Sequence, residues 1–244
     1  MPTKACIQIQ DLYKKYNKAE NYSLEGINLR INSGSKFGIL GPNGAGKTTL
    51  ISIICNIIPP SSGSVSFEKG NNIKQHLGFV PQDYAFYPQL SPVQNMEYFG
   101  ALYNLSKENI AFRIQQLLGT LGLESVADKK VNTFSGGMKR RVNLGIGMLH
   151  NPSILLLDEP TVGVDVQSRH AIMQLLNEIN AQGTTIIYTS HHLKEAEDFC
   201  DHIALIDHGK IIANDSTSSL LKTHQSDDLE SLFIDLTGTE YRDV

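Results

Sequence analysis

A glycine-rich segment early in the chain has the residue types needed to bind a chain of phosphates. It runs from Gly41 to Thr48, reads Gly-Pro-Asn-Gly-Ala-Gly-Lys-Thr, and fits the pattern G-x-x-x-x-G-K-[ST] at every fixed position. Glycines let such a loop curl so that successive backbone N–H groups point at one phosphate chain. Lys47 would bring a positive charge to the β- and γ-phosphates, and the Thr48 hydroxyl would be a ligand of Mg²⁺. A glycine-rich turn that binds nothing is the alternative, and the apolar strand expected before Gly41 disfavours it.

Two neighbouring acids follow a second apolar run. Asp158 and Glu159 come directly after Ile154 to Leu157. Buried strands seldom end in two adjacent carboxylates unless these face a site. Asp158 is suited to hold Mg²⁺ through water, opposite Thr48. Glu159 is suited to act as the catalytic base, which polarises a water for in-line attack on the γ-phosphate. Without the glycine-rich loop, an ordinary strand end with its acids in solvent would be the better interpretation.

Composition limits the classes of protein to consider. The chain has 244 residues, 41% of them hydrophobic, and 21 basic against 25 acidic side chains give a net charge of −4. This charge removes nucleic acid as a default partner, so none is expected. The three cysteines, Cys6, Cys55 and Cys200, lie far apart and without metal-like spacing, which favours a reducing compartment. No apolar run reaches the roughly 18 residues of a membrane helix, and the N-terminus is unlike a signal sequence. A soluble, cytosolic protein is therefore predicted.

Patterns of apolar residues predict the elements that carry these groups. Strands are expected at Cys6–Leu12, Leu24–Ile31, Lys36–Leu40, Gly63–Phe67, His76–Val80, Ile154–Asp158, Thr185–Tyr188, Ile203–Ile206 and, as a hairpin return, Lys210–Ala213. Helices are expected at Lys47–Ile57, Val93–Leu105, Glu108–Leu121, Gly136–Leu149 and Val166–Gln182. The last of these has Asp165 as a plausible N-cap and Gly183 just past its end. The solidly apolar strands indicate a parallel sheet covered on both faces.

The order of these elements predicts an α/β fold with four segments. Residues 1–90 would form a smaller antiparallel sheet and the first part of the core, and residues 91–150 a helical insertion. Residues 151–222 would complete the core. Residues 223–244 form an acidic end, which is most often a solvated face or a loosely held terminus.

The segment Phe134-Ser135-Gly136-Gly137-Met138 adds a more selective marker. Together with the loop and the acid pair, it resembles the signature of the nucleotide-binding subunit of ATP-binding cassette (ABC) transporters, which usually reads Leu-Ser-Gly-Gly-Gln. Phe134 and Met138 depart from that pattern. Ser135, Gly136 and Gly137 remain, and in the family these residues contact phosphate through a hydroxyl and N–H groups at a helix N-terminus.

The resemblance covers essentially the whole chain and assigns further residues. Tyr16 matches the aromatic residue that stacks on adenine, with Tyr13 as a competitor. Gln82 matches the glutamine that senses Mg²⁺, and Asp165, after Val164, belongs to the dimer-facing loop. His191 matches the switch histidine that contacts the γ-phosphate, although His192 stands beside it. The ATP-binding set is therefore Tyr16, Asn43, Gly44, Ala45, Gly46, Lys47, Thr48, Thr49, Gln82, Ser135, Gly136, Gly137 and Asp165; the catalytic set is Glu159, His191 and Lys47, and the metal set is Thr48, Gln82 and Asp158.

The family implies a fold, cofactors and partners. The fold would be a P-loop NTPase (RecA-like) core with a mainly parallel sheet, an antiparallel β subdomain and a helical subdomain insertion. ATP and Mg²⁺ would be the cofactors. Two cassettes would sandwich ATP head to tail, so a second copy or a paralogous cassette is needed. An integral membrane transporter subunit would carry the substrate path, which places this chain at the cytoplasmic face of the membrane.

Several readings stay open within that resemblance. The segments Ser-Gly-Gly-Met-Lys-Arg-Arg and His191 to Glu197 resemble ABC-2-type exporters, although Glu195-Ala196-Glu197 could equally be an exposed acidic helix face. Lys139-Arg140-Arg141 is read as a solvated helix face or a contribution to the phosphate field. Tyr84, Phe86 and Tyr87 could contact the membrane subunit or pack within their own subdomain. The rival from another class is a soluble ABC ATPase of translation or DNA repair, disfavoured by the single set of motifs and the lack of C-x-x-C. A third possibility is a nucleotide-gated module that does not hydrolyse ATP, which the presence of Glu159 and His191 disfavours.

Overall fold

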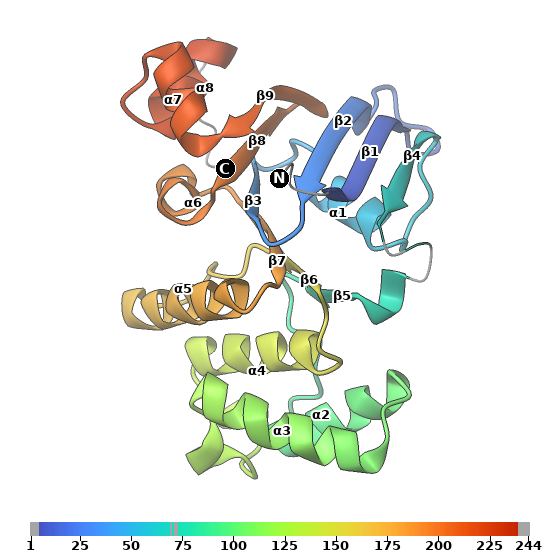
Figure 1. The fold of residues 1–244 in the computed structure, drawn as a ribbon, viewed down its shortest axis with the longest axis vertical. Coiled ribbons are helices and arrows are strands. Elements are labelled where there is room, and N and C mark those ends of the chain that lie inside the picture. The colour runs from blue at the N-terminus through green and yellow to red at the C-terminus, as the bar shows by residue number, and fades with distance from the viewer. Residues whose placement is uncertain (1–4, 69, 71–72, 239–244) are drawn as a thin grey trace. The chain divides into compact units, whose positions relative to one another are not determined.

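The computed structural model describes residues 5–68, 70 and 73–238 (Figure 1). They form two compact units. One, here called the discontinuous unit, combines the chain up to Ile73 with the chain from Thr185 onward. The other, the central unit, is Lys74–Thr184. The boundaries of these two units differ from those of the four segments expected from the sequence, and the division into four segments stays a prediction.

An antiparallel sheet of three strands lies in the discontinuous unit, in the order β2-β1-β4. The strands are β1 (Ala5–Lys14), β2 (Leu24–Asn32) and β4 (Ser62–Phe67). In β2, Ile27, Leu29 and Ile31 are buried while the residues between them are exposed. This period of two is what one covered face of a sheet requires. The small antiparallel sheet predicted from the N-terminal half is therefore confirmed.

Parallel strands of the same unit carry the glycine-rich segment. β3 (Lys36–Leu40) pairs in parallel with β7 (Thr185–Ser190) on one side and β8 (His202–Asp207) on the other. β9 (Lys210–Ser216) returns antiparallel to β8, which confirms the predicted hairpin. β7 is buried throughout, in keeping with a strand covered on both faces. α1 (Lys47–Ile54) follows the loop and ends earlier than predicted, because Asn56 is left-handed with φ 54°.

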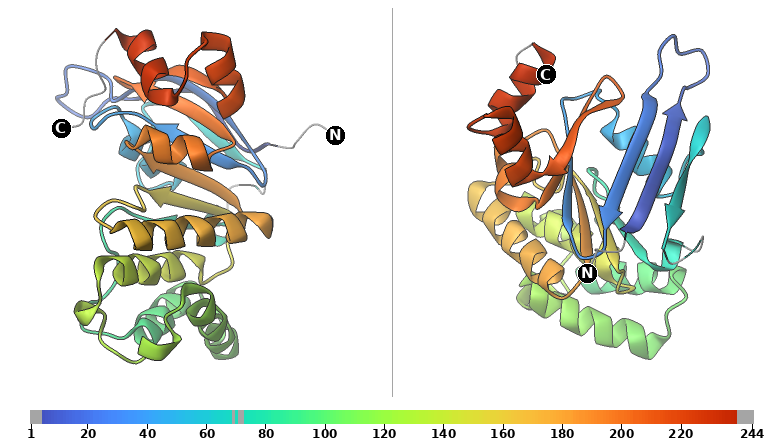
Figure 2. Two further views of the ribbon diagram at one scale, coloured as in Figure 1. Left: turned by 90° about the vertical axis from the view of Figure 1, so that its left-hand side faces the viewer. Right: turned by 45° about the horizontal axis from the view of Figure 1, so that its top comes forward.

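Three further helices complete the discontinuous unit: α6 (Leu193–Phe199), α7 (Thr217–His224) and α8 (Leu229–Thr237). α7 and α8 lie beside each other, and α8 packs on α6 (Figure 2). Leu229, Leu232 and Phe233 of α8 are completely buried. The expectation of a loosely held end is therefore wrong for residues 229–237, whereas Glu230 and Asp235 are exposed, as on a solvated face. Glu240 and Asp243 of the same expectation lie outside the described residues. The acids occupy the outside of a helix whose apolar side chains, spaced i, i+3, i+4, belong to the core.

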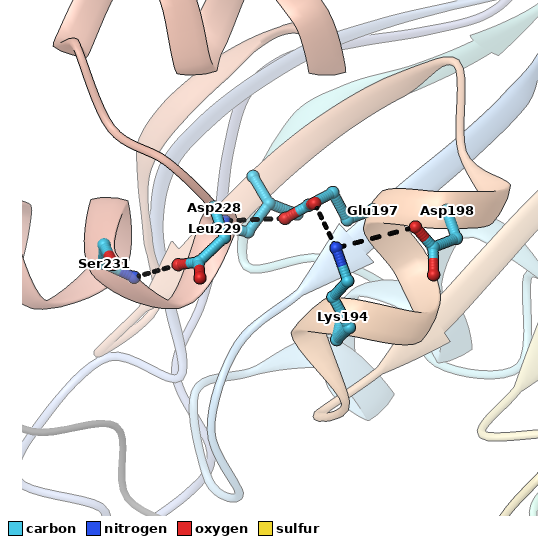
Figure 3. Close-up of polar contacts among 6 residues, drawn as sticks. All are labelled: Lys194, Glu197, Asp198, Asp228, Leu229 and Ser231. Carbon is cyan, nitrogen blue, oxygen red and sulfur yellow. Dashed lines mark hydrogen bonds and ion pairs between the residues drawn. The ribbon is translucent and has the colours of Figure 1, made fainter.

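Glu197 joins α6 to the start of α8 (Figure 3). Its carboxylate accepts a hydrogen bond from the Leu229 backbone N–H (2.8 Å) and another from Lys194 Nζ (2.7 Å). On the same helix, Glu195 accepts a hydrogen bond from the hydroxyl of the fully buried Tyr188. The reading of Glu195-Ala196-Glu197 as an exposed acidic face is therefore wrong. Glu197 instead bonds the backbone at the start of α8, and Glu195 bonds a side chain of the core.

Asp228→Ala should lower the free energy of unfolding by about 1 kcal/mol, the usual cost of losing an N-cap. Asp228 Oδ1 accepts the Ser231 backbone N–H at 2.8 Å, and this bonding lowers the pKa of Asp228 (Figure 3). The contribution is complete above the unfolded-state pKa of an aspartate, about 3.9, and is lost as pH falls through the lower folded-state value. Urea unfolding at pH 7 and below pH 3 measures it. Asp227→Ala, which removes an exposed charge of the same sign beside it, is the control; equal effects of the two variants would contradict the capping role.

The central unit combines two parallel strands with four helices. β5 (Leu77–Val80) pairs in parallel with β6 (Ile154–Asp158). The helices are α2 (Pro92–Leu102), α3 (Lys107–Leu121), α4 (Gly136–Met148) and α5 (Val166–Ala181). α4 contacts β5 and each of the other three helices. Asp165 caps α5 and Gly183 follows its end with φ 98°, so both predicted boundaries are confirmed.

Candidate functional site

The glycine-rich segment forms a loop closed over the Lys47 ammonium group. Lys47 is 5% exposed, and its Nζ donates to Gly41 O (2.7 Å) and Pro42 O (3.2 Å). Gly44 and Gly46 have φ values of 81° and 110°, which residues other than glycine rarely adopt. The sequence predicted this curled loop, and the structure adds that the cation already points at its centre.

The turn between β8 and β9 supports the loop from behind. The Gly209 N–H donates to Ala45 O at 2.9 Å. A Cβ on Gly46 would lie 2.7 Å from Ser23 O, and one on Gly41 would lie 2.1 Å from Ile206 O. Sequence reasoning missed these supports, because Ser23 and Gly209 are far from the loop along the chain. The only signal was a glycine in a hairpin turn, which by itself indicates no partner.

Tyr16 lies beside the first turn of α1. Its side chain is 46% exposed, and its hydroxyl lies 3.5 Å from Thr49 Oγ1. Lys14 Nζ stands 5.2 Å from the centre of its ring. Tyr13, the competitor, instead packs edge-on against Tyr22 with ring centroids 5.7 Å apart. An exposed ring next to the loop suits stacking on a base, so the geometry favours Tyr16 over Tyr13.

His191 lies at the end of β7, beside the start of the glycine-rich loop at the end of β3. β3 and β7 are in register, with Leu40 opposite Ser190, and the Gly41 N–H donates to Ser190 O at 3.4 Å. His191 follows directly on this end of β7. His192 starts α6 instead, and its backbone N–H donates to Ser190 Oγ at 2.9 Å. The carboxyl ends of two adjacent parallel strands thus bring a histidine and the phosphate loop to one edge, where α/β folds bind ligands.

The acid pair and Gln82 share an edge in the central unit. Val80 of β5 is opposite Leu157 of β6. Asp158 is the last residue of β6, Glu159 follows it, and Gln82 follows β5, so all three lie at the carboxyl ends of adjacent strands. Asp158 is 4% and Glu159 5% exposed, while Gln82 is exposed. Glu159 has a φ of 49°, unusual for a residue with a side chain. Such a conformation costs roughly 1–3 kcal/mol and concentrates at functional sites.

The predicted signature lies at the N-terminus of α4. Ser135 caps this helix, and its side chain accepts from the Met138 N–H at 3.3 Å. Gly137 touches the start of α5 so closely that a Cβ would lie 2.1 Å from Ser168 Oγ. Ser168 in turn donates both its backbone N–H and its hydroxyl to Asp165, at 2.9 and 2.7 Å, which lowers the pKa of Asp165. The signature and the Asp165 loop are therefore one packed assembly in the central unit.

The basic run after the signature differs from its interpretation. Arg140 is 3% exposed and donates to backbone carbonyls of the Gln82 loop. Arg141 donates to Leu121 O, at the end of α3, at 2.8 Å. The expectation of a solvated face is therefore wrong for Arg140, and a contribution of this run to the phosphate field stays a prediction. Three consecutive basic residues on a helix carry no local sign of which one faces the interior.

The aromatic residues after Gln82 combine packing with exposure. Tyr84 stacks on Phe86 with ring centroids 5.2 Å apart, and Tyr87 meets Tyr98 edge-on at 5.0 Å. Tyr84 and Tyr87 are nevertheless 41% and 47% exposed. These rings therefore pack within the unit, as one of the two readings expected, whereas a contact of their exposed surface with a membrane subunit stays a prediction.

The residues assigned to Mg²⁺ fit a hard cation. Thr48, Gln82 and Asp158 offer hydroxyl, amide and carboxylate oxygens, and Mg²⁺ usually takes few protein ligands beside phosphate and water. Among the described residues, no group of three or more His, Cys, Asp or Glu side chains could hold a metal ion alone. A Mg²⁺ shared with nucleotide phosphates needs no such group.

No helix in the described part of the chain is long and apolar enough to cross a membrane.

Comparisons with known proteins agree with this arrangement. The family model described as ABC transporter matches residues 24–162. The linearmycin resistance ATP-binding protein LnrL of Bacillus subtilis is 41% identical over 213 residues, which are 85% of this chain and 68% of that protein. The Nod factor export ATP-binding protein I of Cupriavidus metallidurans is 34% identical over 237 residues, 95% of this chain and 78% of that protein.

Solved structures give the same family. The ATP binding subunit of an ABC transporter superposes with a TM-score of 0.84 at 26% identity, covering 95% of this chain and 99% of that one. The ATP-binding cassette MJ0796, a dimer in a post-hydrolysis state bound to ADP and Pi, gives 0.77 at 29% identity, covering 86% and 98%. The mixed α/β fold, with parallel strands and a separate antiparallel sheet, is that of a P-loop cassette. The chain therefore belongs to the ABC transporter family, as an ATP-binding subunit with the ATPase activity of that family.

Proposed function

We propose that this chain hydrolyses ATP to power substrate translocation, in the direction of export, by a separate membrane-spanning subunit. The observation that carries the proposal is the placement of the phosphate loop and His191 at one edge of the adjacent strands β3 and β7. The export direction rests on the relatives, which are named for linearmycin resistance and Nod factor export.

The residues divide the reaction among them. Lys47 and the N–H groups of the loop bind the phosphates, and Tyr16 stacks on the base. Oxygens of Thr48, Gln82 and Asp158 would hold Mg²⁺, which would supply positive charge to neutralise the phosphates. Glu159 accepts a proton from the attacking water as that water bonds to phosphorus and ADP leaves.

Each ATP would be bound by two copies arranged head to tail. One copy has one phosphate loop and one Ser135–Gly137 signature, so two copies make two composite sites. The signature N–H groups at the start of α4 then face the phosphates held by the other copy, and His191 contacts the γ-phosphate. A paralogous cassette could replace the second copy. The exposed rings of Tyr84 and Tyr87 support the region of Gln82 as the docking surface for the membrane subunit, which would hold the chain at the cytoplasmic face.

Mixing two inactive variants tests the composite site. Lys47→Ala removes the loop cation, and Gly136→Asp places a carboxylate where the signature would meet phosphate. Each variant alone should lack ATPase activity. In a mixed dimer both defects fall in one site and leave the other intact. A 1:1 mixture should therefore recover roughly a quarter of the wild-type rate, since about half of randomly paired dimers are mixed and each has one working site.

The mixture is compared with each variant at the same total concentration, after circular dichroism has shown that both fold. Phosphate release is the readout. A mixture no more active than its components would contradict composite sites, because a site contained within one chain cannot be restored by another.

A further inference from the structure

The segment after β5 is held from two sides by helices of the central unit. On one side, α4 presents Arg140 and Asn143, one turn apart and 3% and 2% exposed. On the other, the fully buried Asn95 of α2 bonds both backbone groups of Tyr87, accepting from its N–H at 2.8 Å and donating to its carbonyl at 3.0 Å. The main chain that carries Gln82 is thus fixed by side chains rather than by a strand partner.

Arg140 and Asn143 converge on the backbone around Gln82. Arg140 Nη1 donates to Gln82 O (2.9 Å) and to Pro81 O (3.1 Å). Asn143 Nδ2 donates to the same Pro81 O (3.2 Å), while its Oδ1 accepts the Ala85 N–H (3.1 Å). The Pro81 carbonyl therefore accepts hydrogen bonds from both side chains. The backbone is hydrogen-bonded before Gln82, at Pro81, and after it, at Ala85.

A second link runs from the loop to the signature. The guanidinium of Arg140 stands 5.1 Å from the centre of the Tyr84 ring, and the Tyr84 hydroxyl donates to Gly136 O at 3.3 Å. Gly136 lies in the first turn of α4. Tyr84 of the Gln82 loop thus contacts two residues of α4, Arg140 and Gly136, and so joins the loop to the signature.

The charge of Arg140 also interacts with acidic groups. Burial lowers the pKa of Arg140, and electrostatic interactions with Tyr84, Asp83 and Asp158 partly oppose this effect. Guanidinium groups stay protonated in proteins, so a permanent positive charge stands within electrostatic reach of Asp158. Replacing it by an apolar side chain would change both the position of Gln82 and the local field.

We infer that Arg140 and Asn143 are positioning residues for the reaction: from the signature helix, they fix the main chain that aims the Gln82 side chain at Mg²⁺. This inference rests on the proposed function, in which Gln82 is a metal ligand. It predicts that losing either residue impairs the use of Mg²⁺ before it impairs the binding of nucleotide.

Arg140→Met and Asn143→Ala test the inference in the full chain. For Arg140→Met, the Mg²⁺ concentration that gives half-maximal ATP hydrolysis should rise about 10-fold, as expected for losing hydrogen bonds from a charged donor. The dissociation constant of ADP measured in EDTA should stay within about 2-fold of wild type, whereas that measured with Mg²⁺ should increase. Asn143→Ala should act in the same direction with a smaller effect, because its bonds are neutral.

Arg113→Met is the matched control. Arg113 also donates to two backbone carbonyls, Leu149 O (3.1 Å) and Met148 O (2.8 Å), but at the opposite end of α4. Burial lowers its pKa as well. Arg113→Met should lower the free energy of unfolding as Arg140→Met does, but leave the Mg²⁺ dependence of ATP hydrolysis unchanged. Hydrogen exchange gives a readout apart from activity: amides of residues 82–85 should exchange faster in Arg140→Met and Asn143→Ala, but not in Arg113→Met.

The double variant with Gln82→Ala separates the inference from the proposed function. If Arg140 acts through Gln82, then adding Arg140→Met to Gln82→Ala should change the Mg²⁺ dependence by less than about 2-fold. An equal rise in both backgrounds, or a rise in Arg113→Met equal to that in Arg140→Met, overturns the inference. If Gln82→Ala impairs Mg²⁺ use and neither Arg140→Met nor Asn143→Ala does, the inference alone is wrong. If Gln82→Ala has no effect, the metal role in the proposed function is wrong and the inference falls with it. Should Arg140→Met fail to fold, Asn143→Ala decides between these outcomes.

Discussion

Glu159→Gln is expected to lower the rate of ATP hydrolysis about 10²–10⁴-fold while ATP still binds. The amide keeps the size of the side chain but cannot take up the proton of the attacking water. The loss corresponds to about 3–5 kcal/mol of activation free energy. Because binding remains, the variant should accumulate as an ATP-bound dimer. Phosphate release measures the rate, calorimetric titration measures the affinity, and light scattering measures the dimer.

The Glu159→Gln substitution changes only one chemical group. Glu159 is 5% exposed and directly follows β6, which is buried throughout, and glutamine has the same size and shape as glutamate. Its positive φ of 49° is independent of the acid, since glutamine meets the same backbone cost. Glu178→Gln, an exposed acid on α5 of the same unit, is the control and should keep wild-type turnover. Unchanged turnover in Glu159→Gln would rule out Glu159 as the base, and a parallel loss of ATP binding would assign it a binding role instead.

Lys47→Ala should raise the dissociation constant of ATP about 10²–10⁴-fold. The Lys47 ammonium, 5% exposed, donates to the Gly41 and Pro42 carbonyls and can turn those donors to phosphate oxygens. Hydrogen bonds between charged groups contribute about 1.5–3 kcal/mol each, and two of them give a change of this size. Calorimetric titration with ATP is the measurement.

Two further variants sharpen the result. Lys222→Ala removes an equal charge from the exposed surface of α7 and should leave affinity unchanged. Lys47→Arg keeps the charge but brings a planar fork into a loop shaped for a compact ammonium, so it should not restore binding. Wild-type affinity in Lys47→Ala would count against the assignment of the loop.

The elements predicted best were those whose signals lie within a few neighbouring residues. The solid apolar run of β6 indicated a covered parallel strand, and it is buried from Ile154 to Asp158. Asp165 and Gly183 marked the two ends of α5 correctly, because capping is a contact between residues three apart in the chain. The glycine positions of the phosphate loop likewise dictate its own backbone curl.

Predictions failed where a local pattern had more than one meaning. The acids near the end of the chain suggested a loosely held terminus, although Leu229, Leu232 and Phe233 have the spacing of an apolar helix face. Helix Val93–Leu105 was drawn three residues too long, since α2 ends at Leu102 and Asn104 turns left-handed. Composition outweighed periodicity in the first case, and in the second an asparagine gave only a weak stop signal.

The sequence by itself therefore determined the phosphate loop, the acid pair, the signature and most of the elements that carry them. Only the tertiary structure decided that Arg140 is buried against the Gln82 loop, that Tyr16 rather than Tyr13 lies beside α1, and that the turn at Gly209 supports the phosphate loop. The physical reason is the range of the interactions. Backbone preferences and caps act within a few residues, whereas burial and hydrogen-bond partners depend on which distant segments arrive beside a side chain.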